Sequence, residues 1–291
     1  MPHCAFLTTD NLDGFQTSDH LLVPPMAAAG WRVTDVSWRD PQADWASFDA
    51  VVVRTPWDYL HDVAAFIAVL DAIDRSPARL ANDHALMVWN LDKTYLRAMA
   101  AAGVPIVPTL WADTFDAAHT SGAFAHFGTE EIVVKPVVAA GAHDTFRLDR
   151  PTLAQDQDAL AATFAARPHM IQPFVDTVIR SGEISLFYFG GRYSHAIRKV
   201  PKPGDFRVQE EHGGILTALM PDPAMRAAGD TAMHALDTAP LYARVDLILW
   251  QGTPVLIELE LVEPSLYFDF DAAAPQRFVT AFLDWVSTSP G

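Results

Sequence analysis

Three carboxylates lie inside two apolar stretches near the carboxyl end of the chain. Residues 242–249 and 255–260 flank the short segment Gln251-Gly-Thr-Pro254, a pattern that predicts a β-hairpin. Side chains alternate between the two faces of a strand, so Glu258 and Glu260 should point the same way, and Asp246 can face them from the partner strand. Buried carboxylates repel one another and lose hydration, and a hard divalent cation such as Mg²⁺ removes both costs. A solvated polar face of the hairpin is the alternative for this stretch taken alone.

Two basic features could complement such a site. Lys135 ends the apolar run of residues 131–136, just before the small-residue loop 138–143. Backbone N–H groups and a lysine charge together suit phosphate oxygens, although a surface lysine would give the same local pattern. The loop lacks the Gly-Lys-Ser/Thr ending of a Walker phosphate loop. Lys135 is therefore a candidate phosphate ligand of another type.

The second basic feature is the segment of residues 198–214. It concentrates four cations in a chain of net charge −16, and it ends in the pair Gly213-Gly214. Glycines let a backbone approach a ligand closely. The segment predicts either a locally positive ligand-binding loop or a solvated flexible one.

Composition excludes several classes of protein. The net charge of −16 argues against nonspecific binding to nucleic acid or to anionic membranes. Half of the residues are hydrophobic, which is typical of a globular chain, and the single Cys4 excludes an intrachain disulfide or a cysteine zinc site. We find no signal-peptide pattern and no apolar run of about 18 residues, so we expect a cytoplasmic protein.

The first 85 or so residues predict an open α/β domain. Residues 4–9, 31–37 and 49–54 are typical of strands, residues 19–30 of a helix interrupted near Pro24-Pro25, and residues 63–75 of a helix. Ligands bind beyond the carboxyl ends of strands in such sheets. Those ends carry the segments 8–11 and 54–59, which are either polar loops or part of a binding site.

The rest of the chain predicts two further units. We expect helices over residues 94–102, 152–166 and 275–286, strands over 131–136, 145–148 and 170–175, and a hairpin over 182–200 that turns at Gly190-Gly191. The predicted division is residues 1–87 for a substrate-binding domain, 88–170 for a central subdomain with a phosphate lid, and 171–291 for a subdomain with the metal hairpin.

Taken in order, these motifs resemble the ATP-grasp superfamily, in the branch of glutathione synthetase and the ribosomal-protein S6 glutamate ligases. The resemblance covers about 60% of the chain and rests on Asn90-x-x-Lys93, Val134-Lys135-Pro136, Ile171-Gln-Pro-Phe174, Gly182-Glu183, Arg207-x-Gln209-x-x-x-Gly213-Gly214 and Asp246…Glu258-x-Glu260. It implies a mixed α/β ATP-grasp fold, in which an N-terminal open α/β domain joins two subdomains that clasp ATP.

The resemblance also implies residue roles. Lys93 and Lys135 match the lysines on the α- and β-phosphates of ATP. The remaining matches are Gln172, Pro173, Phe174 and Val175 for adenine, Glu183 for ribose, Lys199 and Arg207 for the transferred phosphoryl group, Gln209 where relatives often carry Asn, and Asp246, Glu258 and Glu260 for two Mg²⁺ ions. Many relatives carry Asn at the position of Glu260, so which carboxylates bridge the metals is open.

The implied activity is ATP-dependent carbon–nitrogen ligation, in which a carboxylate becomes an acyl phosphate that a nitrogen attacks. Three further stretches, residues 53–59, 206–214 and 257–266, resemble a bacterial ATP-grasp group that includes the D-cycloserine-forming ligase, which cyclises O-ureido-D-serine. That resemblance assigns an amino-acid pocket to Thr9, Asp10, Arg54, Asp58, His212, Gly213, Gly214 and Ser265.

Other functions fit the same sequence. An intermolecular dipeptide or glutathione-like ligase would need an added amine, and a nucleotide-binding regulatory module would bind ATP without turnover. Intact Lys135, Asp246 and Glu258 disfavour the regulatory module. A nucleotide-free α/β binding protein is a further alternative. We expect a small amino-acid-like substrate and a possible homo-oligomer.

Overall fold

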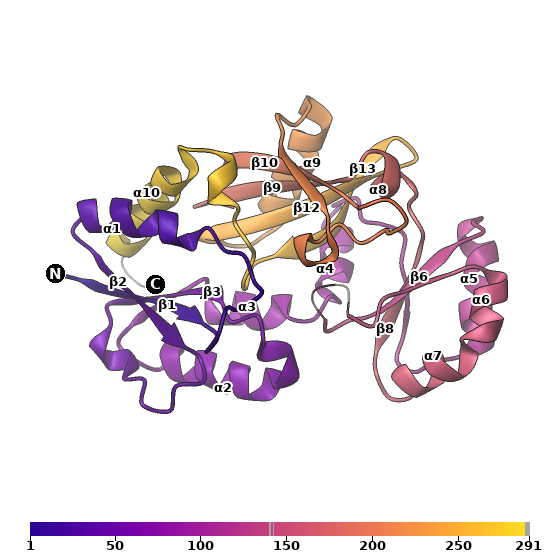
Figure 1. Cartoon of the computed structure of the whole chain (residues 1–291), viewed down its shortest axis with the longest axis horizontal. Helices are drawn as coiled ribbons and strands as arrows, with labels where there is room; N and C mark the ends of the chain where they lie inside the picture. The colour runs from indigo at the N-terminus through magenta and orange to yellow at the C-terminus, as the bar shows by residue number, and fades with distance from the viewer. Residues whose placement is uncertain (140, 142, 289–291) are drawn as a thin grey trace.

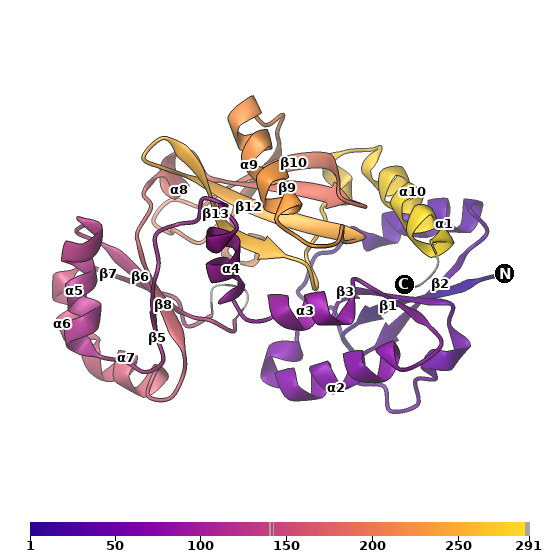
Figure 2. The same cartoon turned by 180° about the vertical axis from the view of Figure 1, so that it is seen from behind.

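Three β-sheets organise the protein (Figure 1). The computed structural model describes residues 1–139, 141 and 143–288. A four-stranded N-terminal sheet lies at one end, a five-stranded sheet lies beside it, and a second four-stranded sheet forms a separate lobe at the other end, as the view from behind also shows (Figure 2). The mixed α/β class expected from the sequence is confirmed.

The N-terminal sheet is parallel, with strand order β2-β1-β3-β4. Alternate residues of its strands face opposite ways, so Cys4 and Phe6 pack on one helical layer while Ala5 and Leu7 pack on another. The strands are β1 (His3–Thr8), β2 (Arg32–Ser37), β3 (Ala50–Thr55) and β4 (Arg79–Ala81), and the layers are α1 (Val23–Ala28) with α10 (Ala274–Ser287) on one face and α2 (Val63–Asp74) on the other.

The helix expected over residues 19–30 is not interrupted by its prolines. A 3₁₀ turn, Asp19–Leu22, leads into α1, and Pro24 and Pro25 lie in the first turn of that helix. Proline is tolerated there because the first N–H groups of a helix have no partner within it. The expected interruption was therefore wrong, since the prolines begin the helix.

The five-stranded sheet is antiparallel throughout and carries the predicted hairpins. One face of this sheet packs on α9 (Pro223–His234) and on α4 (Tyr95–Ala101) through apolar residues that include Leu186, Val245 and Leu259. Its strands in spatial order are β11 (Ile215–Ala218), β10 (Arg192–Val200), β9 (Glu183–Phe189), β12 (Tyr242–Trp250) and β13 (Thr253–Glu260).

The peripheral sheet has strand order β5-β8-β6-β7 and its own apolar core. The helix expected over residues 152–166 is two helices, because the backbone at Asp156 leaves helical geometry. The strands are β5 (Leu110–Ala112), β6 (Ile132–Pro136), β7 (Phe146–Leu148) and β8 (His169–Pro173), and the helices are α5 (Ala117–Phe127), α6 (Arg150–Gln155) and α7 (Gln157–Thr163). Residues 140 and 142 of the expected small-residue loop lie outside the described residues.

The expected domain limits fall inside elements of the structure. The limit at 87/88 lies within α3 (His84–Asn90), and the limit at 170/171 lies within β8. Helix α10, from the expected third unit, packs on the first sheet. The domain division stays a prediction. The remaining short elements are α8 (Thr177–Arg180) and 3₁₀ turns at Trp45–Ser47, Tyr59–His61, Glu210–His212 and Phe268–Phe270. Within the described residues, every helix is too short or too polar to cross a membrane.

Asn82 joins the N-terminal sheet to the five-stranded sheet. This buried amide donates hydrogen bonds to the carbonyls of Tyr242 (2.9 Å) and Leu261 (2.7 Å), and it accepts one from the Leu241 N–H (2.7 Å). Asn82→Ala would leave three buried backbone groups unpaired, so we expect a loss of about 3 kcal/mol in the free energy of unfolding. Urea denaturation measures it. Asn11→Ala, at an exposed position, should change it by less than about 0.5 kcal/mol, and an equal loss in both variants would contradict this prediction.

Candidate active site

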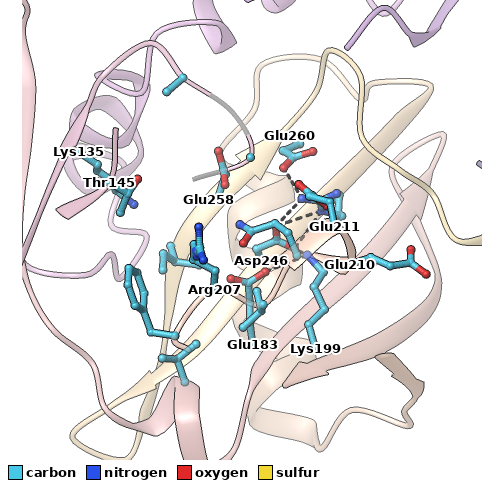
Figure 3. Close-up of a pocket in the computed structure, with 18 of the residues that line it drawn as sticks. Lys135, Thr145, Glu183, Lys199, Arg207, Glu210, Glu211, Asp246, Glu258 and Glu260 are labelled. Atoms are coloured by element: carbon cyan, nitrogen blue, oxygen red, sulfur yellow. Dashed lines mark hydrogen bonds and ion pairs between the residues drawn. The ribbon is translucent and has the colours of Figure 1, made fainter. Parts of the chain in front are cut away.

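A cavity of about 400 Å³ lies between the five-stranded sheet and the peripheral sheet. One wall is the inner face of β9, β10, β12 and β13, and the opposite wall is formed by β6 and β8. The residues at positions 206–211 and the N-terminal residues 14–16, 57 and 60 complete the lining. Figure 3 shows acidic and basic side chains from both walls converging on this space.

Strand alternation places the polar side chains on the cavity face. Asp246 pairs in register with Ser185 of β9 and Glu258 of β13, while Lys199 pairs with Glu183. The intervening residues point into the apolar core on the other face of the sheet. One face of one sheet therefore carries the charged row that the sequence pattern predicted for the hairpin.

The three hairpin carboxylates come together. One oxygen each of Asp246, Glu258 and Glu260 lies within 4.8 Å of the others. Burial opposes the ionisation of Asp246 and Glu258, but the neighbouring cations outweigh it and hold both pKa values below the ordinary range. Burial raises the pKa of Glu260 to about 8, although Arg244 opposes this rise. Oxygen ligands of this kind are what Mg²⁺ takes, so these residues fit the metal.

Arg244 is the residue of this cluster that the sequence analysis missed. Its guanidinium binds Asp246 (Nη2 to Oδ2, 3.0 Å) and also pairs with Glu260. The Arg244 side chain is 11% exposed and lines the cavity. The two carboxylates outweigh the cost of burial and raise its pKa well above the ordinary value. Arg244 precedes Asp246 by two residues, so in a strand both side chains point to the same face of the sheet. This spacing was the overlooked signal.

Lys199 is the cation at the β10 end of the charged row. Its ammonium group lies 2.9 Å from Glu183 and 3.5 Å from Asp246, and its side chain is almost fully buried. In Figure 3, Lys199 and Glu183 converge on Asp246, below Glu258 and Glu260. The two carboxylates raise the pKa of Lys199 against burial, so it is charged at neutral pH.

Lys93 and Lys135 reach the cavity from the opposite side. Lys93 contacts Glu258 (2.8 Å) and the carbonyl of Ala139 (2.5 Å). Lys135 shares a strand face with Val133 and makes no ion pair with any described residue, and burial lowers its pKa to about 8. An anion that enters the cavity would stabilise the charged form of Lys135. The expected contact of Lys135 with a phosphate stays a prediction.

The predicted nucleotide segment also lines the cavity. Gln172, Pro173, Phe174 and Val175 run along its wall, and the Gln172 amide is fixed by a hydrogen bond to Thr109 (2.9 Å). Their roles toward adenine, and that of Glu183 toward ribose, stay predictions.

Arg207 and Gln209 enter the cavity from the segment between β10 and β11. Arg207 binds the neighbouring Asp205 through two nitrogens (3.1 and 2.8 Å). The Gln209 Oε1 atom is buried without a hydrogen-bond partner among the described residues. A buried unpaired acceptor is costly, and a ligand donor would satisfy it.

Four expected substrate residues do not line the cavity. Arg54 is 1% exposed and binds Asp19 through two nitrogens (both 3.0 Å), so its charge is already matched. Asp58 accepts from Trp38 and Arg39 (both 2.7 Å) inside the N-terminal domain. The other two are Thr9, which donates its N–H to Thr55, and Asp10, which accepts from Ser37. The cavity geometry does not support a substrate role for these four.

The glycine pair has a structural reason different from the expected one. A Cβ on Gly214 would lie 1.9 Å from the Val208 carbonyl oxygen, and Gly213 has φ of +83°. Both glycines therefore close their own loop, and neither lines the cavity, which corrects the expected approach to a ligand. His212 likewise contacts the Gly141 carbonyl (3.2 Å) instead of the cavity. Ser265 does line it, as expected.

Comparison with known proteins identifies the family. The profile of the D-cycloserine synthetase DcsG N-terminal domain matches residues 4–82. The chain is 34% identical over 286 residues to the cycloserine biosynthesis protein DcsG of Streptomyces lavendulae, covering 90% of this chain and 93% of that protein. The chain belongs to the D-cycloserine synthetase family of ATP-grasp ligases. The crystal structure of D-cycloserine synthetase DcsG superposes on this ligase with a TM-score of 0.86 at 30% identity, over 98% of this chain and 100% of that one.

More distant structures share the fold. The RimK domain ATP-grasp protein of Sphaerobacter thermophilus superposes on the ligase with a TM-score of 0.71 at 15% identity, over 99% of this chain and 100% of that one. The ATP-grasp ligase PsnB, in a structure that contains Mg and ADP, superposes with a TM-score of 0.66 at 17% identity, over 96% of this chain and 98% of that one. The expected ATP-grasp fold and the ATP-dependent ligase class are therefore confirmed, and ATP with Mg²⁺ is the general requirement of this fold.

Proposed function

We propose that this ligase cyclises O-ureido-D-serine to D-cycloserine with ATP. The observation that carries the proposal is the charge arrangement of the cavity, in which Lys93 and Lys135 face the carboxylates of β12 and β13. Cations beside a metal-binding cluster suit a triphosphate that contacts the lysines and the metal together. The choice of substrate rests on the family, because the Streptomyces lavendulae relative that matches 90% of this chain is named for cycloserine biosynthesis.

We assign a ligand contact to each residue from its position in the cavity. Lys93, Lys135 and Lys199 would hold phosphate oxygens, and the segment from Gln172 to Val175 would hold the base. Asp246, Glu258 and Glu260 would hold Mg²⁺, and we propose two ions. Bound Mg²⁺ would offset negative charge on the phosphate oxygens during transfer.

Charge neutralisation and positioning suffice for the chemistry. The substrate carboxylate takes the terminal phosphoryl group of ATP and becomes an acyl phosphate, with ADP as the other product. The substituted ureido nitrogen then attacks the acyl carbon, phosphate leaves, and a five-membered ring forms. Water removes the carbamoyl group as carbon dioxide and ammonia. Arg244 lies where its charge would meet the carboxylate and the transferred group.

The test is ADP release with O-ureido-D-serine as the sole amino-acid substrate. We expect Mg²⁺-dependent ADP formation and a stoichiometric amount of D-cycloserine by mass spectrometry, without any added amine. ADP formation that requires a second amine would replace this proposal with an intermolecular ligase. Nucleotide binding without turnover of any candidate carboxylate would replace it with a regulatory module.

Two further expectations belong to this proposal. We place the ligase in the cytoplasm, where ATP is supplied, and we expect no nucleic-acid or membrane partner. A homo-oligomer stays a prediction, which light scattering at several protein concentrations would decide.

A further inference from the structure

One end of the cavity is formed jointly by the N-terminal domain and the segment after β13. Phe15, Trp57, Glu263, Ser265 and Tyr267 line this end. The rings of Phe15 and Trp57 lie 5.3 Å apart, so an apolar wall borders the polar groups. The side chains on the charged wall of β9, β10, β12 and β13, by contrast, are the proposed ligands of the metal and of the phosphates. This end of the cavity is therefore the part left for the rest of the substrate.

Glu263 is held rigidly at this end. Its Oε1 atom accepts a hydrogen bond from the Tyr59 hydroxyl (2.8 Å), and its backbone carbonyl accepts one from the Trp57 indole (2.9 Å). Tyr59 is 5% exposed and its ring packs on Phe66 with a centroid separation of 4.7 Å. The carboxylate is thus fixed by buried neighbours, and a fixed acceptor loses little entropy when it binds a ligand.

Glu263 differs in its partners from the cavity carboxylates of β9, β12 and β13. Each of Glu183, Asp246 and Glu258 has a lysine or arginine nitrogen within 4.0 Å, as does Glu260. Among the described residues, Glu263 forms no such ion pair, and its side chain is bound by a neutral hydroxyl. Burial raises the pKa of Glu263, so a cationic ligand group would restore a favourable environment for its charged form.

We propose that Glu263 binds the α-ammonium group of the amino-acid substrate. This inference rests on the proposed function and names the contact by which that site recognises its substrate. In an α-amino acid the nitrogen is bonded to the carbon next to the carboxyl group, so its partner must lie close to the phosphate and metal end. Glu263 follows the metal-site residue Glu260 by three positions and lines the same cavity. Tyr59 orients the Glu263 carboxylate, and the second oxygen of that carboxylate accepts hydrogen bonds from the ammonium group.

The test compares two ligands that differ only in this group. They are O-ureido-D-serine and its deamino analogue, 3-(ureidooxy)propanoate, titrated calorimetrically into the full-length protein with Mg²⁺ and a non-hydrolysable ATP analogue. We expect the unaltered protein to prefer the amino compound by roughly tenfold to a hundredfold. In Glu263→Gln, which can still accept from Tyr59, the preference should fall to about threefold or less. An undiminished preference in Glu263→Gln would overturn the assignment.

Two more variants separate a specific contact from a change of overall charge. Glu210→Gln removes the same charge from another part of the cavity lining and should keep the full preference. Tyr59→Phe removes the orienting hydroxyl and should lower the preference by about threefold. An equal loss in Glu210→Gln and Glu263→Gln would mean a general field effect and would overturn the proposal.

The outcome does not depend on turnover. If O-ureido-D-serine binds with the expected preference but gives no ADP, the proposed function fails and the Glu263 contact stands. If ADP forms normally and the preference is the same with and without Glu263, the contact fails and the proposed function stands. Unchanged affinity for the ATP analogue in Glu263→Gln is the check that the variant is folded.

Discussion

Replacing Glu258 by Gln is expected to lower the rate of ADP release by roughly a hundredfold to a thousandfold. Glu258 has one oxygen within 4.8 Å of oxygens of Asp246 and Glu260, and it also contacts Lys93 at 2.8 Å. The amide keeps the size of the side chain but removes its charge, so both the metal and Lys93 lose an anionic partner. A coupled assay of ADP formation at saturating ATP measures the effect.

The loss should be visible in the metal dependence as well as in the rate. We expect Glu258→Gln to need a higher Mg²⁺ concentration for half-maximal activity, because one ligand is neutral. Glu130→Gln serves as the matched control, since Glu130 lies outside the residues that line the cavity. Full activity in Glu258→Gln at the same Mg²⁺ concentration would show that the metal assignment is wrong.

The second large effect is expected at Arg244. The planar guanidinium binds Asp246 and Glu260 at once, and a lysine at this position offers a single point charge on a different stem. We expect Arg244→Lys to lower kcat by roughly a hundredfold, because the charge is no longer fixed at the place that we propose for the transferred group. The free energy of unfolding should fall by about 1–3 kcal/mol as one buried carboxylate loses its partner.

Rate and stability are measured together for this variant, by single-turnover ADP formation and by urea denaturation. The matched control is Arg226→Lys, whose arginine pairs with Asp230 on the surface of α9 with 40% of its side chain exposed. That exposed pair should contribute less than about 1 kcal/mol. A normal kcat in Arg244→Lys would contradict the proposed role of the guanidinium, whatever its effect on stability.

The sequence located the cluster of three carboxylates because strand periodicity is local. Asp246, Glu258 and Glu260 lie in apolar runs, and the two-residue repeat of a strand fixes the face to which each points. The same rule would have located Arg244. Lys135 lies in β6, as expected from its apolar run, whereas the segment from Gln172 to Val175, which begins in β8 and continues past its end, was found through the family resemblance.

The substrate residues of the N-terminal domain were predicted less well. The segment 54–59 was expected to be either a polar loop or part of a binding site, and of its residues Trp57 lines the cavity whereas Arg54 and Asp58 do not. A loop has no fixed repeat, so its sequence does not say which side chain turns inward. Asp19, 35 residues earlier, takes the guanidinium of Arg54, and this long-range pair decides the orientation.

The sequence by itself thus determined the α/β class and the charged face of the hairpin, because hydrophobic repeats and strand alternation are properties of short stretches. Its ordered motifs carried the ATP-grasp resemblance. Only the tertiary structure decided the composition of the other end of the cavity. There Tyr59 and Trp57, from one domain, fix Glu263 of another across more than 200 residues of chain. Such contacts depend on how the sheets pack against each other, and no local pattern encodes that packing.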